Sequence, residues 1–219
     1  MARLRASHSF GAVLVLIAGS FVFIAATPES DGALSVLVLL QCATLLIALL
    51  TSGLGQDRRP VIPLAIVAVA AAVSVHVFEG DTSEGLVSLL DAILIAATIA
   101  VVALGVVDQG KVNAQSIMGA LCIYLLLGMF FTFVYDTLAS LGDGPFFANG
   151  SDGSAFERLY FSFVTLATLG YGDYTAGGTL GRSLAVFEVL LGQLFLVTAV
   201  ALLVGTLVAG RREPPDSQQ

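Results

Sequence analysis

Long apolar stretches separated by short polar segments dominate the hydropathy pattern of this 219-residue chain. A helix needs about 20 residues to cross a bilayer, and six stretches are close to that length or longer. They lie at Ser9–Ala26, Gly32–Thr51, Val61–Phe78, Gly85–Val107, Ser116–Tyr135 and Leu180–Ala209. The pattern therefore predicts an all-α membrane protein with six transmembrane helices. The first stretch could instead be a secretory signal, but its apolar core is long for a signal and we expect a retained span.

A shorter apolar stretch, Ala155–Ala167, lies between the fifth and sixth predicted spans. It is too short to cross a membrane, and a Gly-containing run, Thr168–Gly172, follows it directly. Backbone that does not span is tolerated at membrane depth only where protein or a water-filled cavity surrounds it. We therefore predict a re-entrant pore helix that leads into a loop.

The composition supports a membrane protein and argues against several other classes. The chain is 57% hydrophobic and 11% charged, whereas a soluble domain is usually about 25% charged. Cys42 and Cys122 lie inside apolar stretches, where packing residues are more common than disulfide or metal pairs. The sequence has no His/Cys metal cluster, phosphate-binding Gly loop or basic stripe. We expect neither an enzyme nor a cofactor, and no nucleic-acid partner.

The placement of charge predicts the orientation in the membrane. Seven of the nine basic residues lie at the start, after even-numbered spans, or at the end: Arg3, Arg5, Arg58, Arg59, Lys111, Arg211 and Arg212. The other connections are acidic. Since basic residues are enriched in cytoplasmic segments, both termini are predicted to be cytoplasmic, in a multi-pass protein of the plasma membrane. Asp173 would then lie at the outer end of the loop.

The residue types in Thr168–Gly172 suit coordination of a bare cation. Gly170 and Gly172 can take positive φ values, so neighbouring peptides can turn their carbonyls to the same side. The carbonyls of Thr168, Leu169, Gly170 and Tyr171 would then replace the water that K⁺ loses on entry. The Thr168 hydroxyl would add one oxygen at the inner mouth.

This run resembles the Thr-Val-Gly-Tyr-Gly selectivity filter of the tetrameric potassium channels, with Leu169 where the family usually has Val. Val112–Ala209 is similar to the outer helix, pore loop and inner helix of that family. The resemblance implies a potassium-selective homotetramer that conducts K⁺ passively, with lipid and further copies of itself as partners. One loop supplies one quarter of a ring, so four chains are needed.

The resemblance also implies residues that support the filter. In the family, an aromatic side chain of the pore helix hydrogen-bonds the Asp after the filter, and the matching residues here are Tyr160 and Asp173. Val164 stands where some relatives have a further Glu partner.

Two residues of the inner helix have open roles. Glu188 could face the cavity, or it could brace the pore helix through Ser162 or Thr165. Of these two roles we favour the brace. Gly192 stands where the family often has a hinge, but glycine is also a common packing residue in membrane helices.

The sequence predicts three regions: a four-helix unit at 1–110, a pore domain at 111–210 and a short cytoplasmic tail at 211–219. The fourth span, Gly85–Val107, contains no Arg or Lys. Moving one charge across 100 mV is worth about 2.3 kcal/mol, so steep voltage gating is not expected. Asp91 could meet His76 and sense pH, or it could only tie helices together. Gln41 is expected to hydrogen-bond between helices.

Three alternatives remain open at this point. One is a non-conducting or regulatory membrane subunit, and another is a weakly selective cation channel. The third is a potassium transporter, although that family carries four degenerate loops in one chain and this sequence has one.

Overall fold

The computed structural model describes residues 10–27, 31–52, 81–108 and 113–210. The helices in this part of the chain are α1 (Phe10–Ala26), α2 (Asp31–Thr51), α4 (Asp81–Asp108), α5 (Ala114–Leu141), α6 (Ala155–Leu166) and α7 (Thr179–Gly210). These helices confirm the all-α prediction. The predicted span Val61–Phe78, with His76, lies outside the described residues, and so do the seven basic residues that predict the orientation.

Three helical segments are long and apolar enough to cross a membrane: Glu84–Asp108, Ala114–Leu141 and Thr179–Leu202. The helix α1 and the part of α2 from Val36 to Thr51 are also apolar but shorter. The 12-residue α6 rises only about 18 Å, which is well short of the bilayer core. The chain is therefore a membrane protein by the length and composition of its helices.

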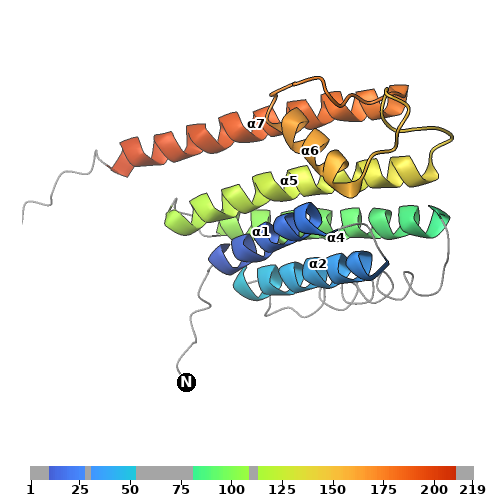
Figure 1. Ribbon diagram of the computed structural model, residues 1–219. Helices are drawn as coiled ribbons and strands as arrows, with labels where there is room; N and C mark the ends of the chain where they lie inside the picture. Colours follow the sequence, from blue (N-terminus) through green and yellow to red (C-terminus); the bar gives the residue numbers. More distant parts are fainter. Residues whose placement is uncertain (1–9, 28–30, 53–80, 109–112, 211–219) are drawn as a thin grey trace, which may run out of the picture.

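The helix α5 lies between two groups of helices (Figure 1). The helices α6 and α7 pack on one side of α5, and α1 and α4 pack on the other, with α2 against α1 and α4. Close approach of α4 and α5 depends on small residues such as Gly119, where an added Cβ would lie 2.3 Å from Val106 Cγ2. The main apolar core forms here, between α1, α2, α4 and α5.

A second, aromatic core fixes the loops around α6. It contains Phe131, Tyr135, Phe146, Phe147, Phe161 and Ala176. The loop residue Phe146 reaches Tyr135 of α5, with ring centroids 5.1 Å apart, and Phe147 reaches Tyr174 at 5.0 Å. Aromatic pairs at such distances add to the stability gained by burial, so the segments before and after α6 are held together.

The helix α7 differs from α5 in how little of it is covered. In the most apolar 18-residue segment of each helix, 11% of the residues are buried in α7 and 50% in α5. Large side chains on several faces of α7, such as Phe187, Leu194 and Val197, are more than half exposed. Contiguous apolar surface of this kind is stable only against lipid or other protein.

Candidate ion pathway

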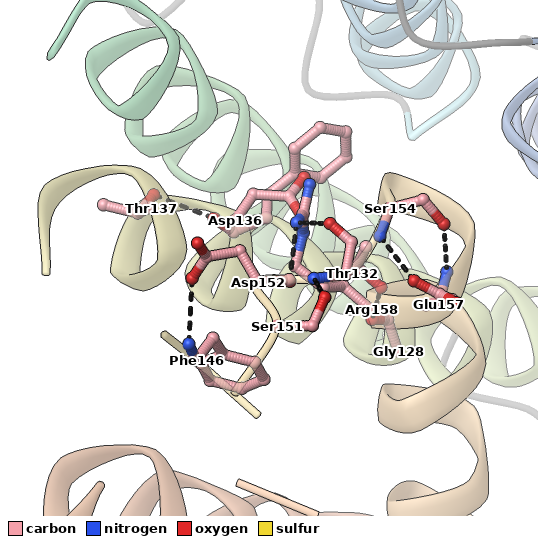
Figure 2. A network of polar contacts seen from close by, with 12 residues as sticks. Gly128, Thr132, Asp136, Thr137, Phe146, Ser151, Asp152, Ser154, Glu157 and Arg158 are labelled. Carbon is pink, nitrogen blue, oxygen red and sulfur yellow. Dashed lines mark hydrogen bonds and ion pairs between the residues drawn. The ribbon is translucent and has the colours of Figure 1, made fainter. Parts of the chain in front are cut away.

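The start of α6 is fixed by a capping box. The Ser154 hydroxyl accepts from the Glu157 amide at 3.2 Å, and the Glu157 carboxylate accepts from the Ser154 amide at 2.7 Å (Figure 2). Serine followed three residues later by glutamate is the sequence signature of this arrangement. It satisfies two amides that the first turn of a helix would otherwise leave without partners.

An ion pair between Arg158 of α6 and Asp136 of α5 anchors the same end of the helix (Figure 2). Arg158 also donates to the carbonyls of Asp152 and Gly153, at 2.9 and 2.6 Å. The two charged side chains are only 12% and 10% exposed, so the pair is largely withdrawn from water. The sequence does not predict this pair, because 22 positions separate the partners.

The face of α6 that contains Phe163 packs closely on α5 and α1. A Cβ on Gly128 of α5 would lie 2.6 Å from the Phe163 ring, so only glycine allows this approach. The same ring packs against Phe21 of α1, with centroids 5.4 Å apart in an edge-to-face arrangement. The first helix thus contacts α6 directly.

The run after α6 has an alternating backbone. Its φ values are +58° at Thr168, +57° at Gly170 and +79° at Gly172, whereas Leu169 and Tyr171 are not in the positive-φ region. The positive values at the two glycines match the sequence prediction. The value at Thr168 was not predicted, because a residue with a Cβ rarely adopts it.

The run is also open to the surroundings. Every residue from Thr168 to Asp173 is exposed in the single chain, whereas Ser162 and Leu166 of the preceding helix are fully buried. Leu169 lies against α6 in an apolar groove that includes Val164, and the Leu169 amide donates to the Val164 carbonyl at 2.9 Å. The Leu169 side chain therefore packs back toward α6.

Two tyrosines join α6 to the segment after the run. Tyr160 donates to Asp173 at 2.9 Å, as the resemblance predicts, and its ring stacks on Tyr171 with centroids 6.4 Å apart. In the reverse direction, Tyr174 donates to Glu157 at 2.5 Å. This second bond was not predicted.

These two bonds also change the acidity of the groups involved. The hydrogen bond to Asp173 raises the pKa of Tyr160, so its hydroxyl continues to donate up to a higher pH than that of an ordinary tyrosine. The bonds from Tyr174 and the Ser154 amide lower the pKa of Glu157, which favours its ionised, accepting form.

Glu188 of α7 is fully buried and faces α6 and α5. One carboxyl oxygen lies 2.5 Å from the Ser162 hydroxyl, and the other lies 2.6 Å from the Tyr135 hydroxyl. Of the two partners suggested by the sequence, Ser162 makes the contact. Within the described residues, no hydrogen bond joins Glu188 to Thr165. Tyr135 was missed because nothing in the local pattern marks it.

Gly192 lies where α7 crosses the end of α6. A Cβ there would lie 2.6 Å from Leu166 Cδ1 and 2.9 Å from the Leu166 carbonyl oxygen. Close packing is therefore sufficient to explain this glycine, and its hinge role stays a prediction.

The helices on the other side of α5 contain a different kind of polar residue. Asp91 of α4 and Gln41 of α2 are 0% and 1% exposed. Among the residues that the structure describes, neither oxygen of Asp91 nor the side-chain nitrogen of Gln41 has a hydrogen-bond partner. The interhelical hydrogen bond expected for Gln41 is therefore not made by its side-chain nitrogen within the described residues, and for its oxygen it stays a prediction.

Comparison with known proteins gives one match. Residues 119–209 match the sequence model of a family described as ion channel, a range that begins in α5, contains α6 and the exposed run, and ends in α7. No curated protein and no solved structure matches the chain. The matched range is less than half of the 219 residues, and over that range the chain is similar to the ion channel family.

Proposed function

We propose that the chain forms a homotetrameric channel that is selective for K⁺ and conducts it passively. One observation carries the proposal: positive φ alternates with ordinary φ across Thr168–Gly172. When residues of positive φ alternate with residues of negative φ, neighbouring peptides can turn their carbonyls to the same side. Four such runs around an axis would supply rings of carbonyl oxygens to a dehydrated K⁺, with sites at Thr168, Leu169, Gly170 and Tyr171.

The exposed surfaces support the tetramer. A single run offers one quarter of a ring, and in the single chain it is exposed along its whole length. The uncovered apolar faces of α7 would meet the neighbouring copies and lipid.

The residues around the run would keep it in the conducting shape. The bond between Tyr160 and Asp173 would hold its outer end, and Glu188 would brace α6 through Ser162. At the other end, the Thr168 amide donates to the Thr165 carbonyl at 2.9 Å. A hydrogen bond to an ionised carboxylate, such as the one from Tyr160 to Asp173, is stronger than a neutral one, which suits a loop of exposed backbone.

We further propose that the channel lies in the plasma membrane with both termini in the cytoplasm and is not steeply voltage-gated. The described helix α4 has no Arg or Lys between Gly85 and Val107. Current recorded across a voltage range should therefore change shallowly. A gating charge of several units per subunit that depends on this helix would contradict this part of the proposal.

The test is a flux assay with purified protein in liposomes. Uptake of K⁺ and Rb⁺ should be far faster than uptake of Na⁺, and cross-linking should give a four-chain species. Equal K⁺ and Na⁺ flux would instead favour a weakly selective cation channel. A tetramer without flux of any of the three ions would favour a non-conducting subunit.

A further inference from the structure

Three short oxygen–oxygen contacts lie where α6 packs against α5 and α7. The Tyr135 hydroxyl is 2.6 Å from one oxygen of Glu188, and the Ser162 hydroxyl is 2.5 Å from the other. The Ser162 hydroxyl is also 2.7 Å from the carbonyl oxygen of Gly128. Each distance lies within the range of an O–H···O hydrogen bond, so each contact needs one proton between its oxygens.

The available protons can be counted. A backbone carbonyl has none to give, so the contact between Ser162 and Gly128 uses the serine proton. The tyrosine proton occupies the contact between Tyr135 and Glu188. No hydroxyl proton is then left for the 2.5 Å contact between Ser162 and Glu188. Only the carboxyl group itself can supply it.

We infer that Glu188 is a protonated carboxylic acid that donates to Ser162, and that this neutral group positions the pore helix. The hydrogen bonds then run in one direction, from Tyr135 to Glu188, from Glu188 to Ser162, and from Ser162 to the Gly128 carbonyl. This series of hydrogen bonds joins α5 to α7, α7 to α6, and α6 back to α5. Bonds in such a buried chain polarise and strengthen one another.

The surroundings of Glu188 favour the neutral form. The side chains of Glu188, Ser162 and Tyr135 are all 0% exposed, and a buried carboxylate without a cation is costly. The two arginines with described side chains are engaged elsewhere, Arg158 with Asp136 and Arg182 with the Ala176 carbonyl. The titratable groups that face Glu188 are Tyr135 and, within electrostatic reach, Tyr124, both of α5.

The positioning role rests on the proposed function, because it concerns the run that begins six residues after Ser162. In an ionised state, Ser162 would have one proton for two acceptors, and one short contact would become repulsive. The helix α6 would then shift away from α5 or α7. A proton on Glu188 thus makes all three contacts attractive at once and keeps α6 in one place.

Infrared difference spectroscopy tests the protonation state without any measurement of conduction. The spectrum of the tetramer in liposomes at neutral pH is compared with that of Glu188→Gln. We expect the carbonyl-stretch band of a protonated carboxyl group, sensitive to deuterium, in the unmodified protein and not in the variant. A carboxylate band that disappears in the variant instead would overturn the inference.

A pair of variants tests the positioning role through K⁺ flux. In Glu188→Gln the amide N–H can donate to Ser162 while the amide oxygen accepts from Tyr135, as the protonated acid does. We expect this variant to keep its flux within about threefold of the unmodified protein, whereas Glu188→Ala, which leaves both hydroxyls without this partner, loses at least about tenfold. Glu84→Gln, the same change at an exposed acid, serves as the matched control.

Equal damage in Glu188→Gln and Glu188→Ala would overturn the inference, because an ionised Glu188 cannot be replaced by an amide. This failure is distinguishable from failure of the proposed function. If the unmodified protein passed no K⁺, the function would be wrong, while the infrared band would still decide whether Glu188 carries the proton.

Discussion

Two buried polar sites lie on opposite sides of α5 and differ in their hydrogen bonds. Between α5, α6 and α7, the buried side chains of Glu188 and Ser162 are hydrogen-bonded to each other. In α4 and α2, the equally buried Asp91 and Gln41 have polar atoms without a hydrogen-bond partner among the described residues. A buried polar group without a partner costs stability, and a satisfied network restricts the packing to one arrangement. The contrast shows where the molecule needs exact geometry. Among the described residues, directional hydrogen bonds join α5, α6 and α7, and apolar clusters join α1, α2, α4 and α5.

The largest expected effect is on the run itself. Gly172→Asp places a residue with a Cβ at a φ of +79°, which costs about 1–2 kcal/mol in the left-handed region. We expect the preference for K⁺ over Na⁺ in liposome flux to fall by about tenfold or more. Gly178→Asp is the matched control, because it adds the same charge in open space at a residue without positive φ. Equal losses in both variants would attribute the effect to charge alone.

The next effect concerns the ion pair that anchors α6. Arg158→Met removes the cation beside Asp136 and leaves a largely buried carboxylate without it. Breaking a buried pair in this way costs about 3–5 kcal/mol, so the thermal unfolding temperature of the tetramer should fall. Arg182→Met is the control, since that exposed arginine donates to a backbone carbonyl and not to a carboxylate. A similar unfolding temperature for both variants would contradict the prediction.

A smaller, kinetic effect is expected at the Asp173 end of the run. Tyr160→Phe keeps the ring stacked on Tyr171 but removes the hydroxyl that donates to Asp173. The K⁺ current should decay faster during sustained opening, while cross-linking still gives the tetramer. Tyr124→Phe provides a control, because the described residues give its hydroxyl no hydrogen bond and its ring stacks on Phe195. Unchanged decay in Tyr160→Phe would show that the bond does not support the run.

The pH dependence of this bond has a definite sign. The raised pKa of Tyr160 means that its contribution to stability is complete below the ordinary tyrosine value, about 10, and is lost as pH rises through the higher folded value. The decay of current in the unmodified protein should therefore be constant across neutral pH. Acceleration attributable to this hydroxyl should begin only in strongly alkaline solution.

The smallest effect is expected on the other side of α5. Asp91→Asn changes a buried acid with no described partner, so the K⁺ preference over Na⁺ should stay within about twofold of the unmodified value. Asp136→Asn, which removes the anion of the Arg158 pair, should lower stability and provides the contrast. If Asp91→Asn instead abolished a response of the flux to pH, the first helices would be sensors and not only structural.

Much of this arrangement follows from local sequence patterns. The apolar stretches predict the described helices to within a few residues at most ends because burial in lipid needs long runs of apolar side chains. Ser154 and Glu157 mark the start of α6, and Gly170 and Gly172 mark positive φ, since each depends only on near neighbours. The bond between Tyr160 and Asp173 was predicted because a family resemblance supplied a distant pairing.

Other features were decided only by the tertiary structure. Arg158 meets Asp136, Tyr135 meets Glu188, and Phe163 fits against Gly128, over separations of 22, 53 and 35 positions. Nothing in a local pattern specifies such partners, because hydrogen bonds and close packing depend on how helices cross. The sequence by itself determined which segments are helical and which residues permit the alternating backbone. The packing of α5, α6 and α7 decided which oxygens meet behind α6, and hence where a proton must lie.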